Sequence, residues 1–398
     1  MTGYILTLNA GSSSLKVALY PADAEEGPVL SGQVEQIGTD PALRAHWAGD
    51  AEVRRDLKPT GDGHRAALEA VLDLISERLV DVRVAAVSHR IVHGGPHRDG
   101  SVILTDDVLE DLAGLSPYAP LHQPHNLSAA RTAAETFPHA VQVGCFDTAF
   151  HRGHPWVNDT FALPRDYYER GVRRYGFHGL SYDYISRRLA ALDPDLHAGR
   201  VVVAHLGNGA SMCGLHGGRS IASTMGFTAL DGLPMGTRSG QLDPGVVLYL
   251  MSEEGLDVDA ITDLLYRRSG LLGLSGLSHD MRTLEASGAP EAAGAISYFV
   301  FRVRRELGAL AAALGGLDAV VFTGGIGENS ATIRQRVCDG TAWMGIDIDP
   351  SANTSNAMEI STTDSRVRVL VLPTDEESVL AREAREHLAG HRKGTSPS

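Results

Sequence analysis

The stretch Tyr4–Tyr20, which reads YILTLNAGSSSLKVALY, predicts two β-strands joined by a short polar turn. The apolar runs 3–8 and 15–20 are strand-like, and the turn between them is rich in hydroxyl groups, with Lys16 just beyond it. Backbone N–H groups, hydroxyls and an ammonium group all suit a phosphate ligand. The turn is therefore a candidate phosphate-binding loop, with an ordinary β-hairpin as the alternative interpretation.

The turn is not a P-loop, because that motif ends in Gly-Lys-Ser/Thr and opens a helix. Here Lys16 is followed by Val17, and the next segment is a predicted strand. The chain has 35 basic residues, of which only Lys16, Lys58 and Lys393 are lysines. A lysine beside a hydroxyl-rich turn in such a chain favours the phosphate interpretation, because its charge is compact.

Two further glycine-rich loops follow predicted strands far downstream. HLGNG at 205–209 ends the predicted strand 200–206, and GGIGEN at 324–329 follows the predicted strand 318–323. The strand–loop units 5–11 and 202–209 have similar patterns and are separated by half of the chain, which is a weak repeat signal. We therefore expect two α/β halves of related topology, with a ligand site in the cleft between them.

Composition narrows the class of protein. A chain of 398 residues with 43% hydrophobic and 21% charged residues suits a two-domain globular enzyme. The net charge of −14 argues against binding to nucleic acid or to an anionic membrane. The three cysteines lie far apart without metal-ligand spacing, which indicates a reducing cytoplasm. The sequence also has no apolar run long enough to span a membrane.

Strands and helices alternate along the chain, which is typical of an α/β fold. Further strands are predicted at 84–88, 140–144, 211–215 and 367–372. Helices are predicted at 64–80, at 181–192 with Ser181 as N-cap, at 291–314 and at 376–388. We place one domain at residues 1–149 plus about 379–398 and the other at 150–378, because the last helix can pack back on the first domain.

Charged side chains follow the ends of two predicted strands. Strand 84–88 leads to Arg90 and strand 140–144 leads to Asp147, and ligands of α/β sheets bind at the carboxyl ends of strands. Arg90 and Arg238 both lie near glycines, so both are candidates to converge on an anion. Structural ion pairs are the alternative for each arginine.

Histidines and oxygen ligands complete the candidate site. His178 and His205 lie beside glycine-rich loops and suit hydrogen bonding to phosphate, whereas we expect His125 to bond within its own loop. A zinc site is not predicted, because no third ligand has suitable spacing. Asn9, Asp147 and Glu376 are hard oxygen ligands that suit Mg²⁺ beside a phosphate. The alternative for Glu376 and Glu377 is a favourable acidic first turn of the last helix.

Four motifs together resemble the signatures of the acetate kinases. These are Asn9–Lys16, His205–Gly209, MGTRSG at 235–240 and FTGGIGEN at 322–329, and the resemblance extends from residue 5 to about residue 383. It implies the actin-like superfamily of acetate and sugar kinases, heat-shock ATPases and actin, with an α/β fold of two duplicated actin-like (ribonuclease H-like) domains and an interdomain cleft. It also implies a homodimer and reversible, direct in-line transfer of the ATP γ-phosphoryl to acetate, giving acetyl phosphate and ADP.

The resemblance also implies roles for individual residues. Asn9 and Glu376 match the positions that bind Mg²⁺ (or Mn²⁺), and Asp147 matches the essential acid. Arg90 and Arg238 match the arginines that hold the carboxylate and the transferring phosphoryl, and His178 matches a transition-state stabiliser. The implied substrate-binding residues are Arg90, Val92, Leu121, His122, Phe177 and Ala229. The implied ATP-binding residues are Ser12, Ser14, Lys16, His205, Leu206, Gly207, Asn208, Gly209, Asp280, Met281, Arg282, Gly325, Ile326, Gly327, Glu328 and Asn329.

The chain departs from the family pattern at three places. The family usually has Gly-Thr-Ser-His after its Gly-Phe-His motif, where this chain has Gly179-Leu180-Ser181-Tyr182. The usual Thr-Pro-Leu-Glu-Gly is Thr-Ala-Leu-Asp-Gly at 228–232, so Ala229 replaces a proline of the methyl pocket. SHD at 278–280 replaces a more usual Ser-Ser-Asp beside the nucleotide.

Three other functions remain as alternatives at this point. A propionate kinase of the same family is the closest, because Ala229 is smaller than proline. A sugar kinase of the superfamily needs a general base for its alcohol, and the arginine pair argues against it. A non-catalytic ATP-binding module of the actin or heat-shock type is the most distant. The sequence leaves open the acyl preference, the physiological direction, the nucleotide preference, the metabolic partner enzyme and the dimer affinity.

Overall fold

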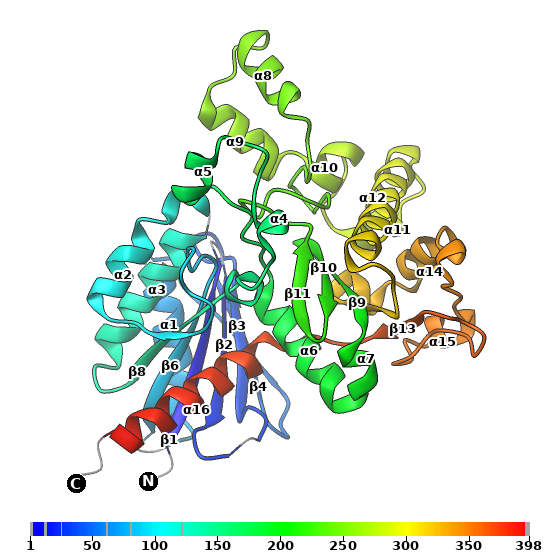
Figure 1. The fold of residues 1–398 in the computed structure, drawn as a ribbon. Helices are drawn as coiled ribbons and strands as arrows, with labels where there is room; N and C mark the ends of the chain where they lie inside the picture. Colours follow the sequence, from blue (N-terminus) through cyan, green and yellow to red (C-terminus); the bar gives the residue numbers. More distant parts are fainter. Residues whose placement is uncertain are drawn as a thin grey trace. The chain divides into compact units, whose positions relative to one another are not determined.

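The computed structural model describes residues 3–11, 14–24, 26–60, 63–79, 82–120 and 122–394. The chain forms two compact units (Figure 1). Unit 1 contains Met1–Ala149 and Asp375–Ser398, and unit 2 contains Phe150–Thr374. Each unit is built around its own β-sheet, and each is described here by itself.

The described part of unit 1 contains an eight-stranded sheet in the order β5-β4-β3-β2-β1-β6-β8-β7. The strands β1 to β5 form consecutive antiparallel pairs, whereas β1, β6 and β8 run parallel. Their bounds are β1 Gly3–Ala10, β2 Leu15–Pro21, β3 Leu30–Glu35, β4 Ala42–Trp47, β5 Glu52–Asp56, β6 Arg83–Ile91, β7 Val102–Ile103 and β8 Val141–Phe146.

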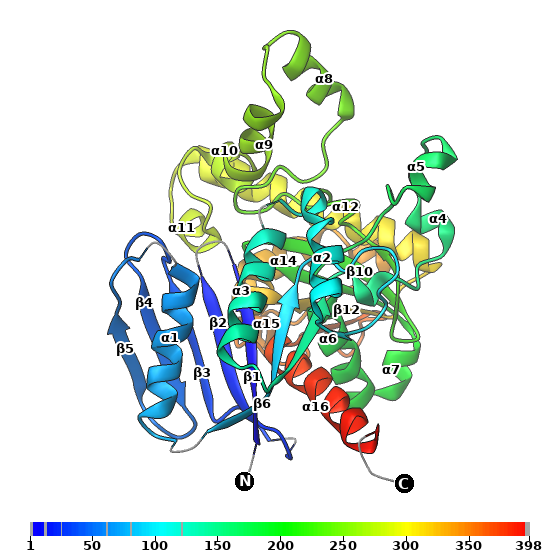
Figure 2. The same ribbon diagram turned by 90° about the vertical axis from the view of Figure 1, so that its left-hand side faces the viewer.

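Helices cover both faces of this sheet (Figures 1 and 2). Helices α1 (Gly63–Ser76) and α3 (Gln123–Thr136) pack on one face, where Leu6 and Leu8 of β1 enter a common core with them. Helix α16 (Glu376–Gly394) packs against β1, β6 and β8 on the other face. Because side chains alternate along a strand, β1 is buried on both sides and reads as a nearly continuous apolar run.

The described part of unit 2 contains a five-stranded sheet in the order β11-β10-β9-β12-β13. Helix α6 (Gly179–Leu192) packs on one face, where Ile185 and Leu189 contact Cys213 and Leu215 in one core. Helix α12 (Pro290–Leu314) covers the other face, where Leu314 lies against Gly214. The strand bounds are β9 Arg200–Leu206, β10 Ala210–His216, β11 Arg219–Ser223, β12 Ala319–Thr323 and β13 Arg368–Val371.

The two sheets share one topology. In unit 1 the order β3-β2-β1-β6-β8 has two antiparallel pairs followed by two parallel pairs, and β11-β10-β9-β12-β13 in unit 2 has the same order and the same directions. The strand–loop units around 5–11 and 202–209 are the corresponding strands β1 and β9. The predicted duplication of an α/β half is therefore confirmed, and its sequence signal came from these two central strands.

Shorter helices complete the two units. In unit 2, five aspartates accept a backbone hydrogen bond at a helix N-terminus, which satisfies donors that lack a partner within the helix: Asp193, Asp243, Asp257, Asp280 and Asp349. The remaining α-helices are α2 Asp106–Ala113, α4 Trp156–Asp159, α5 Arg165–Glu169, α7 Pro194–Ala198, α8 Pro244–Ser252, α9 Val258–Arg267, α10 Gly270–Ser275, α11 Met281–Glu285, α13 Gly324–Asn329, α14 Ala331–Asp339 and α15 Pro350–Thr354.

Most predicted elements agree with this architecture, with two corrections. Each predicted strand overlaps an observed strand, but the helix predicted at 64–80 ends at Ser76. Ser181 does not cap α6, because the helix begins at Gly179 and His178 is its N-cap residue, in the left-handed region with φ of 58°. Among the described residues, no helix combines the length and apolar character needed to cross a membrane.

Candidate active site

The carboxyl ends of three neighbouring strands in unit 1 bring together three predicted site residues. Asn9 lies near the end of β1, Arg90 near the end of β6, and Asp147 directly after β8. These strands are parallel and adjacent, so their carboxyl ends meet at one edge of the sheet. The predicted convergence of Arg90 and Asp147 is thus a consequence of strand order.

Arg90 is held by several oxygen atoms. Its Nε and Nη2 donate to the two carboxylate oxygens of Asp147 at 2.9 and 2.7 Å, and its Nη1 donates to Oδ1 of Asn9 at 3.2 Å. A carboxylate oxygen of Glu376, at the start of α16, lies 3.7 Å from Nε. The fork-to-fork geometry of the Arg90–Asp147 pair fixes the plane of the guanidinium.

The buried charges of this cluster influence one another. The Asp147 side chain is 2% exposed and that of Glu376 is 14% exposed. Burial raises the pKa of Glu376, and the charge of Asp147 adds to the effect while Arg90 opposes it. Burial lowers the pKa of Arg90, but Asp147, Glu376 and Glu377 outweigh burial and raise it. Arg90 is therefore a permanent cation within a carboxylate cluster that holds excess negative charge.

Side chains of α3 fix the backbone around this cluster. Asn126 donates from Nδ2 to the carbonyl of Ala10 at 2.6 Å and accepts from the amide of Val92 at 3.0 Å, which joins the ends of β1 and β6. Gln123 accepts from the amide of His93 and donates to its carbonyl. Both helix residues are buried, and the sequence analysis did not identify either. Their only sequence signal is an amide side chain on the apolar face of a helix.

The β1–β2 turn is only partly described. Ser12 and the pocket residue Leu121 lie outside the described residues, whereas the amide of Gly11 donates to the carbonyl of Ser14 at 2.8 Å. Lys16 lines a surface cavity of about 410 Å³ on unit 1, together with Arg44 and Asp375. Val92 is buried, and His122 is the half-buried N-cap residue of α3.

Two histidines of unit 2 stack on each other. The rings of His178 and His205 are 4.4 Å apart and inclined by 25°. Nδ1 of His178 is 2.8 Å from the hydroxyl of Ser211, and Nδ1 of His205 is 2.8 Å from the hydroxyl of Ser181. The β9–β10 pairing places Ser211 opposite His205, so the sheet register brings the two imidazole–hydroxyl pairs together.

Arg238 lies in the tightly packed 235–240 loop of unit 2. Its Nη1 donates to the carbonyl of Ala229 at 2.8 Å. A Cβ atom at Gly209 would lie 3.5 Å from Nη2 of Arg238 and 3.3 Å from Nε2 of His178. A Cβ at Gly270 would meet the carbonyl oxygen of Met235 at 2.2 Å. Glycine is therefore required at Gly270, whereas the absent side chain at Gly209 leaves both nitrogen atoms beside bare backbone.

The 324–329 segment forms the short helix α13 directly after β12. The carboxylate of Glu328 accepts from the amide of Gly324 at 2.8 Å and from the amide of Thr374 at 3.2 Å. Arg334 is fully buried and donates to the carbonyls of Gly327 and Glu328, both at 2.9 Å. Hydrogen bonds of the Glu328 and Arg334 side chains to backbone groups therefore fix the predicted ATP-binding segment. The sequence analysis did not identify Arg334.

The remaining predicted residues of unit 2 lie in different environments. Asp280 caps α11 and pairs with the exposed Arg282, whereas Met281 between them is buried. Phe177 is buried, and Ala229 is half-buried. Pocket residues Val92 and Phe177 belong to different units, so their predicted common role in a methyl pocket stays a prediction.

The turn before His178 depends on a buried histidine. His151 is 0% exposed, and its Nε2 donates to the carbonyl of Phe177 at 3.0 Å while Nδ1 lies 2.8 Å from the Ser220 hydroxyl. Gly176 has φ of 74°, and a Cβ there would lie 2.6 Å from the His151 ring. His151 thus supports the turn that delivers His178, although the sequence analysis gave it no role.

The duplicated five-stranded topology and the polar groups at the strand ends define a two-unit protein of the actin-like ATPase class. The model of the Acetokinase family matches residues 4–382, and the chain belongs to this family.

Relatives and solved structures agree with this assignment. A protein named acetate kinase from Methylocella silvestris is 56% identical over 392 residues, covering 96% of this chain and 97% of the relative. A propionate kinase structure from Francisella tularensis is 35% identical with a TM-score of 0.90, covering 96% of this chain and 98% of its own. An acetate kinase structure from Porphyromonas gingivalis is 37% identical with a TM-score of 0.87, covering 97% of this chain and 100% of its own.

Acid should weaken the fold of unit 2 through His151. Burial lowers the pKa of His151 to about 4, below the value of about 6.5 for an unfolded histidine. The stabilising effect of the neutral ring is therefore fully present above about pH 6.5 and is lost as the pH falls toward 4. Between pH 7 and 4.5 we expect the wild type to lose about 2 kcal/mol more unfolding free energy than the His151→Gln variant.

Urea denaturation at several pH values measures this difference. Glutamine retains an amide donor for the Phe177 carbonyl but has no proton to gain, so it is a matched replacement. Parallel pH dependence of the two proteins would show that His151 does not titrate during acid unfolding.

Proposed function

We propose that the protein is an acetate kinase, which transfers the γ-phosphoryl group of ATP reversibly to acetate and gives acetyl phosphate and ADP. The observation that carries the proposal is the similarity over almost the whole chain to a protein named acetate kinase, at 56% identity. The clustering of Asn9, Arg90, Asp147 and Glu376 in unit 1 supports it, because these groups suit an anionic carboxylate and a phosphoryl group.

The chemistry of a carboxylate acceptor agrees with these residues. A carboxylic acid with a pKa near that of glutamate, about 4.3, is already ionised at neutral pH, so no general base has to remove a proton. The difficulty is that an anion approaches an anionic phosphoryl group. We assign Arg90 and Arg238 to holding the carboxylate and the phosphoryl, and His178 to donating a hydrogen bond to the charge that develops during transfer.

Asp147 acts on this chemistry through Arg90. Its bidentate hydrogen bonds fix the guanidinium plane, and an arginine in one orientation can bind a carboxylate directionally. Because the attacking carboxylate needs no base, we propose that Asp147 positions Arg90 and, when Mg²⁺ is bound, would help to orient the ion or a water molecule.

The residues of unit 1 fit a Mg²⁺ ion held by Asn9 and Glu376. Within the described residues, no group of three or more His, Cys, Asp and Glu side chains is arranged to hold a metal ion. A Mg²⁺ bound with phosphates commonly uses one or two protein carboxylates plus water, so the pair is sufficient. Burial already raises the pKa of Glu376, and a divalent cation would offset the negative charge of the cluster. When bound, the ion would neutralise charge on the phosphates.

We assign nucleotide binding mainly to unit 2. The segment 205–209 ends β9, the segment 324–329 follows its parallel neighbour β12, and Asp280–Arg282 lies at the start of α11. Ser12 and Ser14 of the β1–β2 turn, and Lys16 at the start of β2, are proposed to contact the phosphates. We also propose a cytoplasmic location, where ATP is present and the free cysteines Cys145, Cys213 and Cys338 stay reduced.

Removal of either arginine should impair turnover strongly. We expect Arg90→Ala and Arg238→Ala each to lower kcat by about 10²-fold or more, the scale of a lost oxyanion donor. Acyl phosphate formation, trapped as hydroxamate, measures the rates. Arg65→Ala and Arg187→Ala are matched controls, because both arginines form exposed ion pairs, one in each unit. Near-normal turnover of both test variants would contradict the assignment.

The acyl group should be selected weakly. One methylene is worth about 1–3 kcal/mol in an apolar pocket, and Ala229 is smaller than the usual proline. We expect the highest kcat/KM for acetate, appreciable use of propionate, and little use of butyrate. Ala229→Pro should lower the propionate-to-acetate ratio of kcat/KM.

The same series tests propionate kinase as the alternative function. That alternative is favoured by Ala229 and by the similarity to the propionate kinase structure. A higher kcat/KM for propionate than for acetate would establish it, and strict rejection of propionate would contradict the role given to Ala229.

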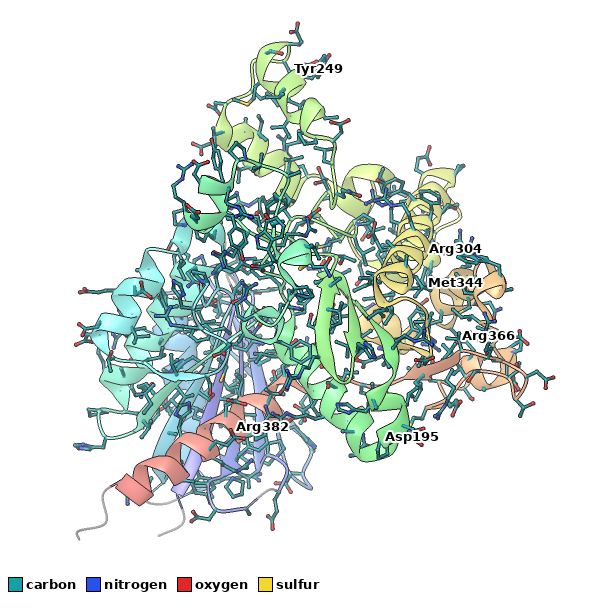
Figure 3. The ribbon with its side chains drawn as sticks, viewed as in Figure 1. Asp195, Tyr249, Arg304, Met344, Arg366 and Arg382 are labelled. Atoms are coloured by element: carbon teal, nitrogen blue, oxygen red, sulfur yellow. The ribbon has the colours of Figure 1, made fainter. Side chains whose placement is uncertain are left out.

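We further propose a homodimer formed through unit 2. Helix α8 carries VVLYLM at 246–251, yet none of its residues is buried. Leu248 is 66% exposed, Tyr249 is 51% exposed and Val258 on α9 is 69% exposed. In Figure 3, Tyr249 projects outward from α8. Large apolar side chains that are exposed in this number on neighbouring segments of the sequence favour an interface between copies of the chain.

A charge on α8 should weaken the dimer. We expect wild-type protein to sediment as a dimer and Leu248→Glu to shift toward monomer at the same concentration, because a carboxylate would be buried without a partner. Leu163→Glu is a control, because Leu163 is also exposed (53%) but lies outside α8 and α9. A wild-type monomer would overturn the proposal.

A further inference from the structure

A chain of hydrogen bonds inside unit 2 ends on His178. The hydroxyl of Tyr182 lies 2.5 Å from the hydroxyl of Ser211, which lies 2.8 Å from Nδ1 of His178. Tyr182 and Ser211 are both 0% exposed. Both are fixed by secondary structure, since Tyr182 belongs to α6 and Ser211 to β10. The direction in which each proton of this hydrogen-bond series points is therefore determined by the protein and not by solvent.

The partners of Tyr182 and Ser211 set the direction of the protons. Within the described part of the chain, Ser211 is the hydrogen-bond partner that the structure gives the Tyr182 hydroxyl. A buried hydroxyl proton needs an acceptor, so Tyr182 donates to the oxygen of Ser211. The Ser211 proton then points at Nδ1 of His178, which must accept it. A neutral imidazole whose Nδ1 accepts carries its own proton on Nε2.

We propose that Tyr182, acting through Ser211, holds His178 in the tautomer that carries its proton on Nε2. The proposal rests on the function assigned to His178 above. Nε2 is the nitrogen that lies beside the bare backbone of Gly209 and close to Arg238, since a Cβ at Gly209 would approach both groups within 3.5 Å. Tyr182 and Ser211 are thus positioning residues, which supply a hydrogen-bond donor toward the side where Arg238 lies.

Tyrosine at this position is suited to the task. The family usually has histidine here, and an imidazole can donate or accept and titrates near neutral pH. Burial raises the pKa of Tyr182 well above its ordinary value of 10, and buried Cys213 beside it adds to the effect. Tyr182 therefore stays a donor throughout the physiological range.

Two other polar side chains of unit 2 lie close to His178. The ring of His205 stacks on that of His178, with centroids 4.4 Å apart. His205 has its own hydroxyl partner, Ser181, at 2.8 Å. Arg238 lies beside Gly209 on the Nε2 side. The two imidazole–hydroxyl pairs are separate, so each can be altered alone.

Tautomers can be observed directly by ¹⁵N NMR of histidine-labelled protein, because protonated and unprotonated ring nitrogens have different shifts. His178→Gln assigns the signals. We expect an Nε2-protonated His178 in the wild type and a mixture of tautomers in Tyr182→Phe, in which the Ser211 hydroxyl can rotate. This readout does not need catalysis, so it stands even if no acyl phosphate is formed and the proposed function fails.

Kinetics add a signature that a packing defect would not show. At about pH 8, Tyr182→Phe should lower kcat by about 3- to 10-fold, the effect of one ordinary hydrogen bond, with smaller changes in KM.

Two variants serve as controls on the same helix. Tyr184→Phe removes a hydroxyl that forms no hydrogen bond within the described residues, and should change neither the His178 tautomer nor kcat. Ser181→Ala should alter the signals of His205 while His178 keeps its tautomer. An Nδ1-protonated His178 in the wild type, or an unchanged tautomer in Tyr182→Phe, would overturn the proposal.

Discussion

Parallel pairing at the centre of each sheet is the constraint on which the rest of the structure depends. In unit 1, β1 pairs in parallel with β6 and β6 with β8, and in unit 2 β9 pairs in parallel with β12 and β12 with β13. Parallel neighbours end at the same edge, so side chains distant in the sequence meet there. The meeting of Asn9, Arg90 and Asp147 follows from this pairing. So does the closeness of the 205–209 and 324–329 segments, where a Cβ at Gly324 would lie 2.8 Å from the carbonyl oxygen of Leu206.

The sequence could predict those parts of the site that lie at strand ends. A buried central strand has an apolar pattern long enough to recognise, and the next polar residue is then placed at the sheet edge; Arg90 and Asp147 were found in this way. Strands β3, β4 and β5 were missed because they alternate polar and apolar residues over short lengths beyond the central strands. Their order in the sheet depends on long-range pairing, which local patterns do not contain.

The residues whose side chains hold the backbone next to the site could not be predicted either, because their contacts also depend on long-range packing. Asn126 links Ala10 to Val92, and Arg334 binds the carbonyls of Gly327 and Glu328. In the sequence each is a polar residue in a helix, which is ordinarily a surface residue. Ser181 could not be interpreted from the sequence for the same reason. Its position suggests an N-cap residue, but its hydroxyl is hydrogen-bonded to Nδ1 of His205 instead. Only the packing of helix on strand decides between these uses.

A protein with a net charge of −14 can bind anions when individual arginines are placed at its site. Arg90 is stabilised as a cation by carboxylates that also orient it, whereas Arg238 donates to the neutral carbonyl of Ala229. Position 229 therefore has two effects: its side chain bears on the proposed methyl pocket, and its backbone anchors an arginine of the proposed phosphoryl site. If a residue at position 229 changed both the shape of the proposed pocket and the local backbone, it would alter the choice of acyl group and the placement of Arg238 together. The carbonyl belongs to the backbone and is present whichever residue stands at 229, so a change of side chain there can alter the proposed pocket while the acceptor for Arg238 remains.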